Sequence, residues 1–216
     1  MKIINKYSIS LILLVIVTLT SSPLYADNFS GKTYYTKVNV WYEQPNKILS
    51  TNYHRGAILP IGTKVKIHSI KGQKIQFTPD GSAQMFTIIN DKNTSTISTD
   101  VLFNRYFSIE AVQVGVGDYY QATDADRENI KNGTITPGMS KKAVLMAYGY
   151  PPTHKTPLLT SDIWHYWYSR PSKVIVYFKD DNVFQIERID PKLFPIFTKS
   201  IVESEGGTKS RNKTKE

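Results

Sequence analysis

Short runs of alternating apolar and polar residues are the feature that most constrains how this chain folds. Residues 64–70 alternate strictly, and residues 74–78 alternate again after a turn that contains glycine. Similar runs at 34–42 and 85–89 are bounded by glycine, proline or aspartate. Runs of this length and spacing are typical of a small barrel or sandwich. The sequence therefore predicts an all-β, barrel-like domain over residues 27–117.

The pattern changes after residue 118, where two short helices are expected before three strands. Acidic residues begin the first helix, at 123–130, where the helix dipole favours them. Ser140 is a natural N-cap for the second helix, and Gly149 is placed to end it with a positive φ. The three strands are expected at 163–168, 173–179 and 183–189.

These two patterns predict an α+β fold class with two domains. The β-rich domain spans 27–117, and a domain with two helices on one face of an antiparallel sheet spans 118–192. A C-terminal extension follows at 193–216. From about residue 204 it has no apolar residue, so we expect it to be disordered.

Residues 1–26 have the pattern of a cleavable secretory signal peptide. Lys2 and Lys6 precede an apolar run of 11 residues from Ile9 to Leu19, and Ala26 supplies the small residue before the cut. The run is too short for a membrane-spanning helix, which needs about 20 residues. With no cysteine near the cut, we expect an exported, soluble protein that is not lipid-anchored.

Charge and cysteine content restrict the expected partners. The formal net charge is +9, and removal of the two lysines of the signal peptide leaves +7. This excess favours anionic partners such as lipid headgroups, glycan acids or acidic protein patches. Nucleic acid is not expected as a partner, because no basic block is interleaved with aromatic residues. The chain has no cysteine, so its fold depends on its core and not on disulfides.

Four sequence elements occur in order over residues 130–186, namely Pro137–Val144, Gly149–Pro152, Trp164–Trp167 and Val176–Phe178. In these elements the chain resembles the SmpA/OmlA (BamE-like) domain of bacterial envelope proteins. The resemblance implies an α-α-β-β-β unit that binds a protein partner and has no enzymatic activity and no cofactor. It also implies a bacterial periplasmic location, with an outer-membrane or barrel-assembly component as the candidate partner.

The aromatic strand is the candidate partner-binding surface, since Trp and Tyr are enriched at binding hot spots. One face of the strand carries Trp164, Tyr166 and Tyr168, and the other carries His165 and Trp167. The alternation leaves open which face is exposed, and whether the second face is covered by the N-terminal domain or by the loop at 150–162. The predicted partner-binding residues are Trp164, Tyr166, Trp167, Tyr168, Gln185 and Glu187.

A loop is the candidate site of the N-terminal half. It contains Tyr53, His54 and Arg55, although a turn packed with polar groups is the favoured interpretation. The four histidines lack the spacing of metal ligands, so no metal site is predicted. No catalytic residue and no cofactor are predicted either.

Two alternatives to a protein-binding module remain. Leu59–Ile67 resembles a strand of double-psi β-barrels, some of which cut or bind peptidoglycan, and Asp91 falls where such barrels carry an acidic residue. Lys92 and Asn93 stand where those barrels have Arg and Gly. The first alternative is therefore a peptidoglycan-active or peptidoglycan-binding barrel with a BamE-like targeting domain. The second is a protein that binds anionic lipid or glycan surfaces through its charge.

Overall fold

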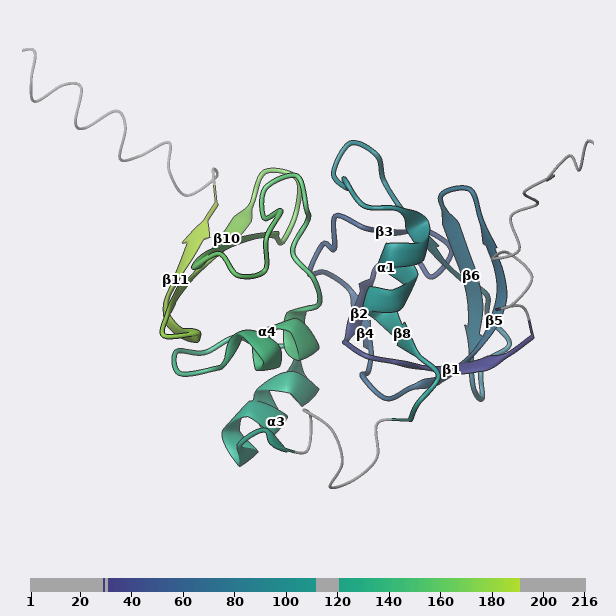
Figure 1. Ribbon diagram of the computed structural model, residues 1–216, viewed down its shortest axis with the longest axis horizontal. Coiled ribbons are helices and arrows are strands. Elements are labelled where there is room, and N and C mark those ends of the chain that lie inside the picture. Colours follow the sequence, from purple (N-terminus) through teal and green to yellow (C-terminus); the bar gives the residue numbers. More distant parts are fainter. Residues whose placement is uncertain (1–28, 30, 112–120, 191–216) are drawn as a thin grey trace, which may run out of the picture.

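The computed structural model describes residues 29, 31–111 and 121–190. They form two parts that lie side by side, an N-terminal part up to residue 111 and a C-terminal part from residue 121 (Figure 1). The predicted signal peptide and C-terminal extension lie outside the described residues. Among the helices that are described, none is long and apolar enough to cross a membrane.

The N-terminal part is built on an open sheet of six strands in the order β3-β7-β6-β5-β1-β8. Its pairs are antiparallel except for β3 with β7. Alternate side chains of β5 and β6 face inward, so that Ile67 and Phe77 are fully buried. The strands are β1 Thr33–Thr36, β3 Ile48–Leu49, β5 Lys64–Lys71, β6 Lys74–Pro79, β7 Phe86–Ile89 and β8 Phe107–Ser108.

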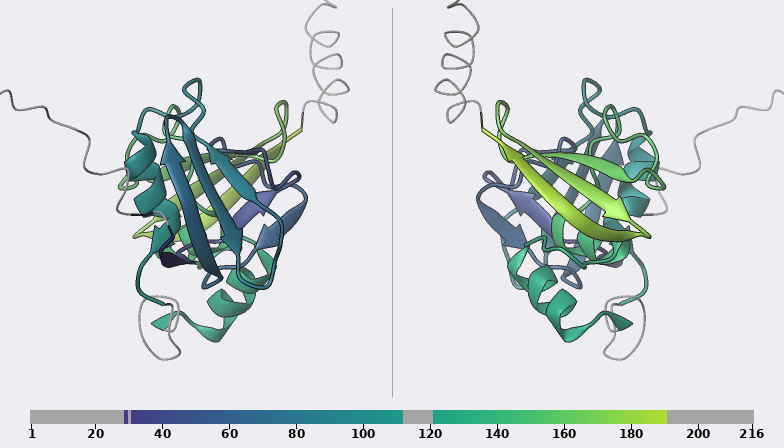
Figure 2. Two further views of the ribbon diagram at one scale, coloured as in Figure 1. Left: turned by 90° about the vertical axis from the view of Figure 1, so that its right-hand side faces the viewer. Right: turned by 90° about the vertical axis from the view of Figure 1, so that its left-hand side faces the viewer.

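Helix α1 (Thr99–Tyr106) covers the core of this sheet and lies beside it in Figure 2, left. The Ser98 hydroxyl caps the helix by accepting a hydrogen bond from the Val101 amide at 3.2 Å. The buried stripe of the helix consists of Leu102, Phe103 and Tyr106, which join the core of the N-terminal part.

The C-terminal part places two helices against a three-stranded antiparallel sheet in the order β11-β10-β9. The inner face of the sheet carries the fully buried Trp164, Tyr166 and Val176, which form one core with Val144 and Ala147 of α4. The elements are α3 Asp124–Asn132, α4 Lys141–Tyr148, β9 Ile163–Trp167, β10 Lys173–Lys179 and β11 Asn182–Ile189.

The two parts are joined by hydrogen bonds to the C-terminal end of α4. The last four carbonyl groups of a helix have no partner within it, and here the N-terminal part supplies donors for three of them. The Asn39 amide N–H donates to Met146 at 2.9 Å, and Asn39 Nδ2 donates to Ala147 at 3.1 Å. Asn52 Nδ2 donates to the Tyr148 carbonyl at 2.7 Å.

A separate two-stranded sheet, β2 (Val40–Tyr42) with β4 (Ala57–Leu59), extends this junction to α3. Gly133 ends α3 with a φ of +61°, a conformation that favours glycine. A Cβ atom at Gly133 would lie 2.5 Å from the Trp41 ring and 2.6 Å from Ile58. The close approach of the two parts therefore depends on glycine at this position.

The predicted α+β fold class is wrong, because the described residues form a mostly β structure. It has three sheets, of six, three and two strands, and three helices of eight or nine residues. The N-terminal part is not an all-β barrel, since its sheet is open and α1 covers the core in place of further strands. The predicted order, a β domain and then α-α-β-β-β, also fails to describe the chain, because α1 and β8 intervene and β2–β4 forms a sheet of its own.

Asn39 provides a test of the junction. It is 1% exposed, donates also to the Ile130 carbonyl at 2.6 Å, and accepts from the Ile61 amide at 2.9 Å. We expect Asn39→Ala to lower the free energy of unfolding by about 3 kcal/mol, because it leaves buried polar groups without partners. Chemical denaturation followed by tryptophan fluorescence measures this. Asn93→Ala, which removes only the exposed side-chain hydrogen bond from Asn93 Nδ2 to Asp91, serves as the control and should change stability by less than about 0.5 kcal/mol.

Candidate functional site

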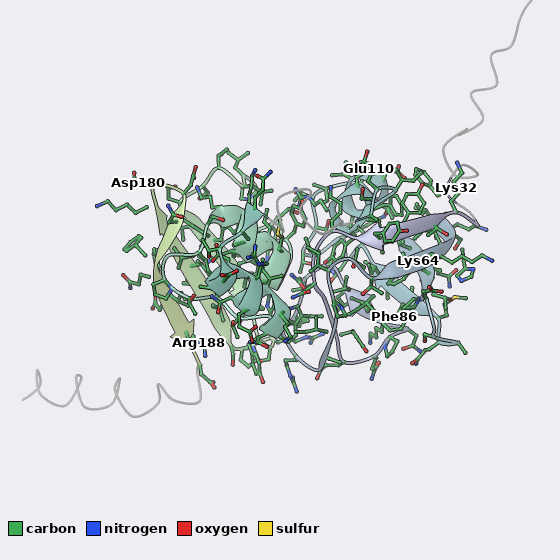
Figure 3. The ribbon with its side chains drawn as sticks, turned by 90° about the horizontal axis from the view of Figure 1, so that it is seen from below. Lys32, Lys64, Phe86, Glu110, Asp180 and Arg188 are labelled. Atoms are coloured by element: carbon green, nitrogen blue, oxygen red, sulfur yellow. The ribbon has the colours of Figure 1, made fainter. Side chains whose placement is uncertain are left out.

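A pocket of about 520 Å³ lies where the two parts meet. We call it the junction pocket. Three aromatic residues line it, Trp41 from β2, Tyr148 from the end of α4, and Tyr168 just after β9. Its cationic lining residues are Arg55, Lys173 and Arg188. Figure 3 labels Arg188, which lies near the end of β11 in the C-terminal part.

The charge of the junction pocket is positive. Asp190 is the acidic residue of its lining, against three cations. Arg55 forms an exposed salt bridge with Glu43 at 3.2 Å, and its guanidinium lies 6.0 Å from the centre of the Tyr168 ring. Lys173 and Arg188 take part in none of the salt bridges between described residues. Two cations are therefore available to an anionic ligand.

Stacked aromatic rings form the inner wall of the junction pocket. The His54 ring stacks on the Tyr148 ring with centroids 3.8 Å apart. The Trp41 ring meets the His54 ring edge-on, with centroids 5.5 Å apart. Burial raises the pKa of Tyr148, and the nearby charge of Arg188 opposes that rise. The wall is therefore an uncharged aromatic surface next to cations.

His54 is held as a neutral structural residue. Its Nε2 lies 2.7 Å from the Tyr148 carbonyl and its Nδ1 lies 3.3 Å from the Trp167 carbonyl. A neutral imidazole has one N–H, and the shorter distance places it on Nε2, which then donates to Tyr148. Burial lowers the pKa of His54 to about 4, and the two backbone hydrogen bonds oppose this shift. His54 thus joins the two parts and supports the wall of the pocket.

The predicted aromatic residues lie in different environments. Trp164 and Tyr166 are 0% exposed, and the Tyr166 hydroxyl donates to the Gly149 carbonyl at 3.0 Å. Trp167 is on the outer face of the sheet, but the His154 ring stacks on it at 5.3 Å and leaves it 8% exposed. Tyr168 is 54% exposed. Of these four residues, Tyr168 is the one that a partner can reach.

The remaining predicted residues are spread over three places. Gln185 is exposed and Glu187 half-buried on β11, where the Tyr177 hydroxyl donates to Glu187 at 2.9 Å. Tyr53 lines a second pocket, of about 370 Å³, which shares Trp41 with the junction pocket. The structure therefore brings His54, Arg55 and Tyr168 together at the junction pocket and places Tyr53, Gln185 and Glu187 outside its lining.

Nine lining residues of the junction pocket were not predicted from the sequence, and among them Trp41 and Tyr148 supply aromatic rings and Lys173 and Arg188 supply positive charge. For Arg188 a signal existed, because it follows Ile186 by two positions and so shares the inner face of β11. A charged residue on the apolar face of a strand indicates a site that a counter-charge can reach. For the others the signal was absent, since pairings between distant segments bring them together.

The residues that the alternatives invoked have structural roles. Asp91 Oδ1 accepts hydrogen bonds from the backbone and side chain of Asn93 at 3.0 and 2.9 Å, as in a turn. Within the described residues, no group of three or more His, Cys, Asp or Glu side chains is placed to hold a metal ion.

Comparisons with protein-family models, with curated proteins and with solved structures gave no match to this chain. The resemblance to the SmpA/OmlA family therefore stays a prediction, and the function must be argued from the site.

His54 predicts a specific pH dependence of stability. Its pKa of about 4 in the folded state is below the 6.5 of an ordinary histidine. The unfolded chain therefore binds this proton first, and stability falls as the pH drops from about 6.5 towards 4. We expect His54 to account for a loss of about 3 kcal/mol over this window.

Denaturation at a series of pH values, with wild type compared to His54→Gln, isolates this contribution. Carboxyl groups titrate equally in both proteins, so the difference between the two curves reports on His54. Parallel curves for wild type and His54→Gln would show that the histidine is not held neutral.

Proposed function

We propose that the protein is a non-catalytic binding module of the bacterial cell envelope, which docks an acidic segment of a partner protein in the junction pocket. The observation that carries the proposal is the pairing of two available cations, Lys173 and Arg188, with an aromatic wall in one pocket. Arg binds carboxylates through two parallel hydrogen bonds, and aromatic rings pack on the aliphatic part of acidic side chains.

The chemistry of the lining supports binding more than catalysis. The histidine of the pocket has both ring nitrogens directed at backbone carbonyls, so it is not placed to exchange protons with a ligand. The lining has one carboxylate, Asp190, and no thiol. Two carboxylates, or a nucleophile with an adjacent base, would be needed for common hydrolytic mechanisms.

The cellular location is the part of the proposal that rests on sequence. The signal-peptide pattern of residues 1–26 supports export, and the SmpA/OmlA resemblance supports a periplasmic location and an outer-membrane or barrel-assembly partner. A net charge of +7 after cleavage would steer the protein towards acidic surfaces of envelope proteins.

A pair of charge changes tests the binding site. We expect Lys173→Gln with Arg188→Gln to weaken binding of a glutamate-rich peptide of about ten residues roughly tenfold, since it removes two exposed charge pairs. Fluorescence anisotropy of the labelled peptide at low ionic strength is the measurement. Lys71→Gln with Lys74→Gln removes the same charge at the β5–β6 turn and should change the affinity by less than about twofold.

Two results would contradict the proposal. Equal weakening by both charge pairs would show that the peptide responds to net charge and not to the pocket. Binding of anionic lipid vesicles that depends on Lys173 and Arg188, with no peptide binding, would assign the pocket to a membrane surface.

A further inference from the structure

β11 ends its sheet with an unpaired edge. It is the outermost strand in the order β11-β10-β9, and it crosses the front of the molecule in Figure 2, right. Near its start, Val183 donates to the Met139 carbonyl and accepts from the Gly138 amide. From Phe184 to Ile189, no further backbone partner outside β10 occurs within the described part of the chain.

The other sheet edges are short or covered. β3 and β8, the edges of the large sheet, have two residues each, and β2 and β4 have three. The edge of β9 is covered, because Trp167 bridges to Tyr53 and the His165 amide donates to the Thr156 hydroxyl at 3.0 Å. Long unprotected edges tend to pair with another chain. Among the described strands, β11 is the edge strand that is both long, with eight residues, and uncovered.

The hydrogen-bond pattern shows which residues of β11 direct their backbone outward. The N–H and C=O groups of Val183 both form hydrogen bonds on the side away from β10. Its partner on β10, Phe178, directs its N–H away from β11 and donates to the Asp162 carbonyl at 2.8 Å. A bulge at Phe184 follows, and the pairs Val176 with Ile186 and Val174 with Arg188 continue the ladder. Residues in an antiparallel pair alternate between bonding the neighbour and facing away.

Ile186 and Arg188 are therefore the residues whose N–H and C=O groups point to the open edge. Their side chains share the inner face of the sheet with Val176 and Val174. Ile186 is half-buried and packs on the core of the C-terminal part, and Arg188 lines the junction pocket. An added strand would thus meet an apolar position and a cationic position two residues apart.

From this arrangement we infer that the acidic partner segment binds as an extended strand added to the edge of β11. It pairs with Ile186 and Arg188, and it carries an acidic residue opposite Arg188 and an apolar residue two positions away, opposite Ile186. This inference rests on the proposed function and adds the conformation and side-chain spacing of the partner. Period-two spacing follows because successive side chains of a strand point to opposite faces.

Charge complementarity favours a foreign acidic segment over a second copy of this chain. The exposed edge carries Arg188 and, next to the bulge, the 54% exposed Phe184. A charged residue that points inward from an edge strand deters uncharged strands from pairing there. An acidic residue removes that penalty, so the same arginine excludes general aggregation and selects the partner.

The test uses labelled peptides of about ten residues, rich in threonine, that differ only in spacing. One peptide has isoleucine and glutamate two positions apart, and its isomer has them adjacent. We expect the first to bind the full-length exported chain at least about tenfold more tightly than the isomer. Equal affinities would overturn strand addition.

Two pairs of variants separate the edge from the charge. Ile186→Pro removes an outward N–H that no described group accepts, whereas Ile186→Val keeps it; Pro is tolerated at such edge positions. We expect Ile186→Pro to weaken the peptide about tenfold and Ile186→Val less than about threefold. Likewise Arg188→Pro should bind more weakly than Arg188→Gln, which loses the charge alone. Circular dichroism confirms that each variant is folded.

Hydrogen exchange gives a readout that does not depend on any substitution. On addition of the peptide, hydrogen exchange of the Ile186 and Arg188 amides should slow. The amides of Gln185 and Glu187 are already bonded to β10, so their exchange should change little.

If Arg188→Gln weakens peptide binding but Ile186→Pro and the two amides show no effect, strand addition is wrong and pocket recognition stands. If Ile186→Pro weakens it and Arg188→Gln does not, the edge binds peptides and the proposed acidic specificity fails. Light scattering that shows dimers blocked by Ile186→Pro would instead assign the edge to a second copy.

Discussion

The structure depends on how the C-terminal end of α4 is satisfied. Its last four carbonyl groups receive donors from Gly149, Asn39, Trp41, Asn52 and His54. All but Gly149 come from the N-terminal part. A buried carbonyl without a donor costs about 1–3 kcal/mol, so the helix end is complete only when the two parts are docked. We therefore regard the described residues as one cooperative unit, although they contain two hydrophobic cores.

The junction pocket is a consequence of this docking. The segment that brings Asn52 and His54 to α4 continues into Arg55, and the strand after Asn39 carries Trp41. The groups that hold the parts together are thus neighbours in sequence of the groups that line the pocket. Because His54 stacks on Tyr148, separation of the two parts at low pH would also remove His54 from the aromatic wall of the pocket. Binding and stability are expected to respond to pH in the same direction.

The sequence was informative about local structure. The alternation at 64–70 and 74–78 corresponds to β5 and β6, and Ser140 caps α4, where its hydroxyl accepts from the Ala143 amide at 3.2 Å. These features depend on residues close in the chain. Gly149 has the expected positive φ of 73°, but its ψ of −171° is not that of a left-handed residue. A Cβ atom at Gly149 would lie 2.8 Å from Asn52 Nδ2.

The assembly of these elements could not be predicted in the same way. The fold-class prediction gave each half a self-contained architecture, whereas the contacts of Asn39, Asn52 and His54 span about ninety residues or more of sequence. The aromatic strand is apolar on both faces, so alternation alone could not show that Trp164 and Tyr166 face the core. Alternation also left open whether the loop at 150–162 covers the second face, and in the structure His154 of that loop stacks on Trp167.

The same limit explains why the sequence directed attention to a sheet face and the structure to a sheet edge. The order of residues shows how side chains alternate along a strand, and this alternation predicted Gln185 and Glu187 as exposed positions. Which backbone groups lack partners depends on the neighbouring strands. Only the pairing of β10 with β9 and β11 shows that the N–H and C=O groups of Ile186 and Arg188 point to the open edge. Arg188 belongs to both descriptions, because its side chain lines the pocket and its backbone lies on the edge. The proposed ligand uses both, since its acidic residue would meet the side chain and its extended backbone would meet the edge.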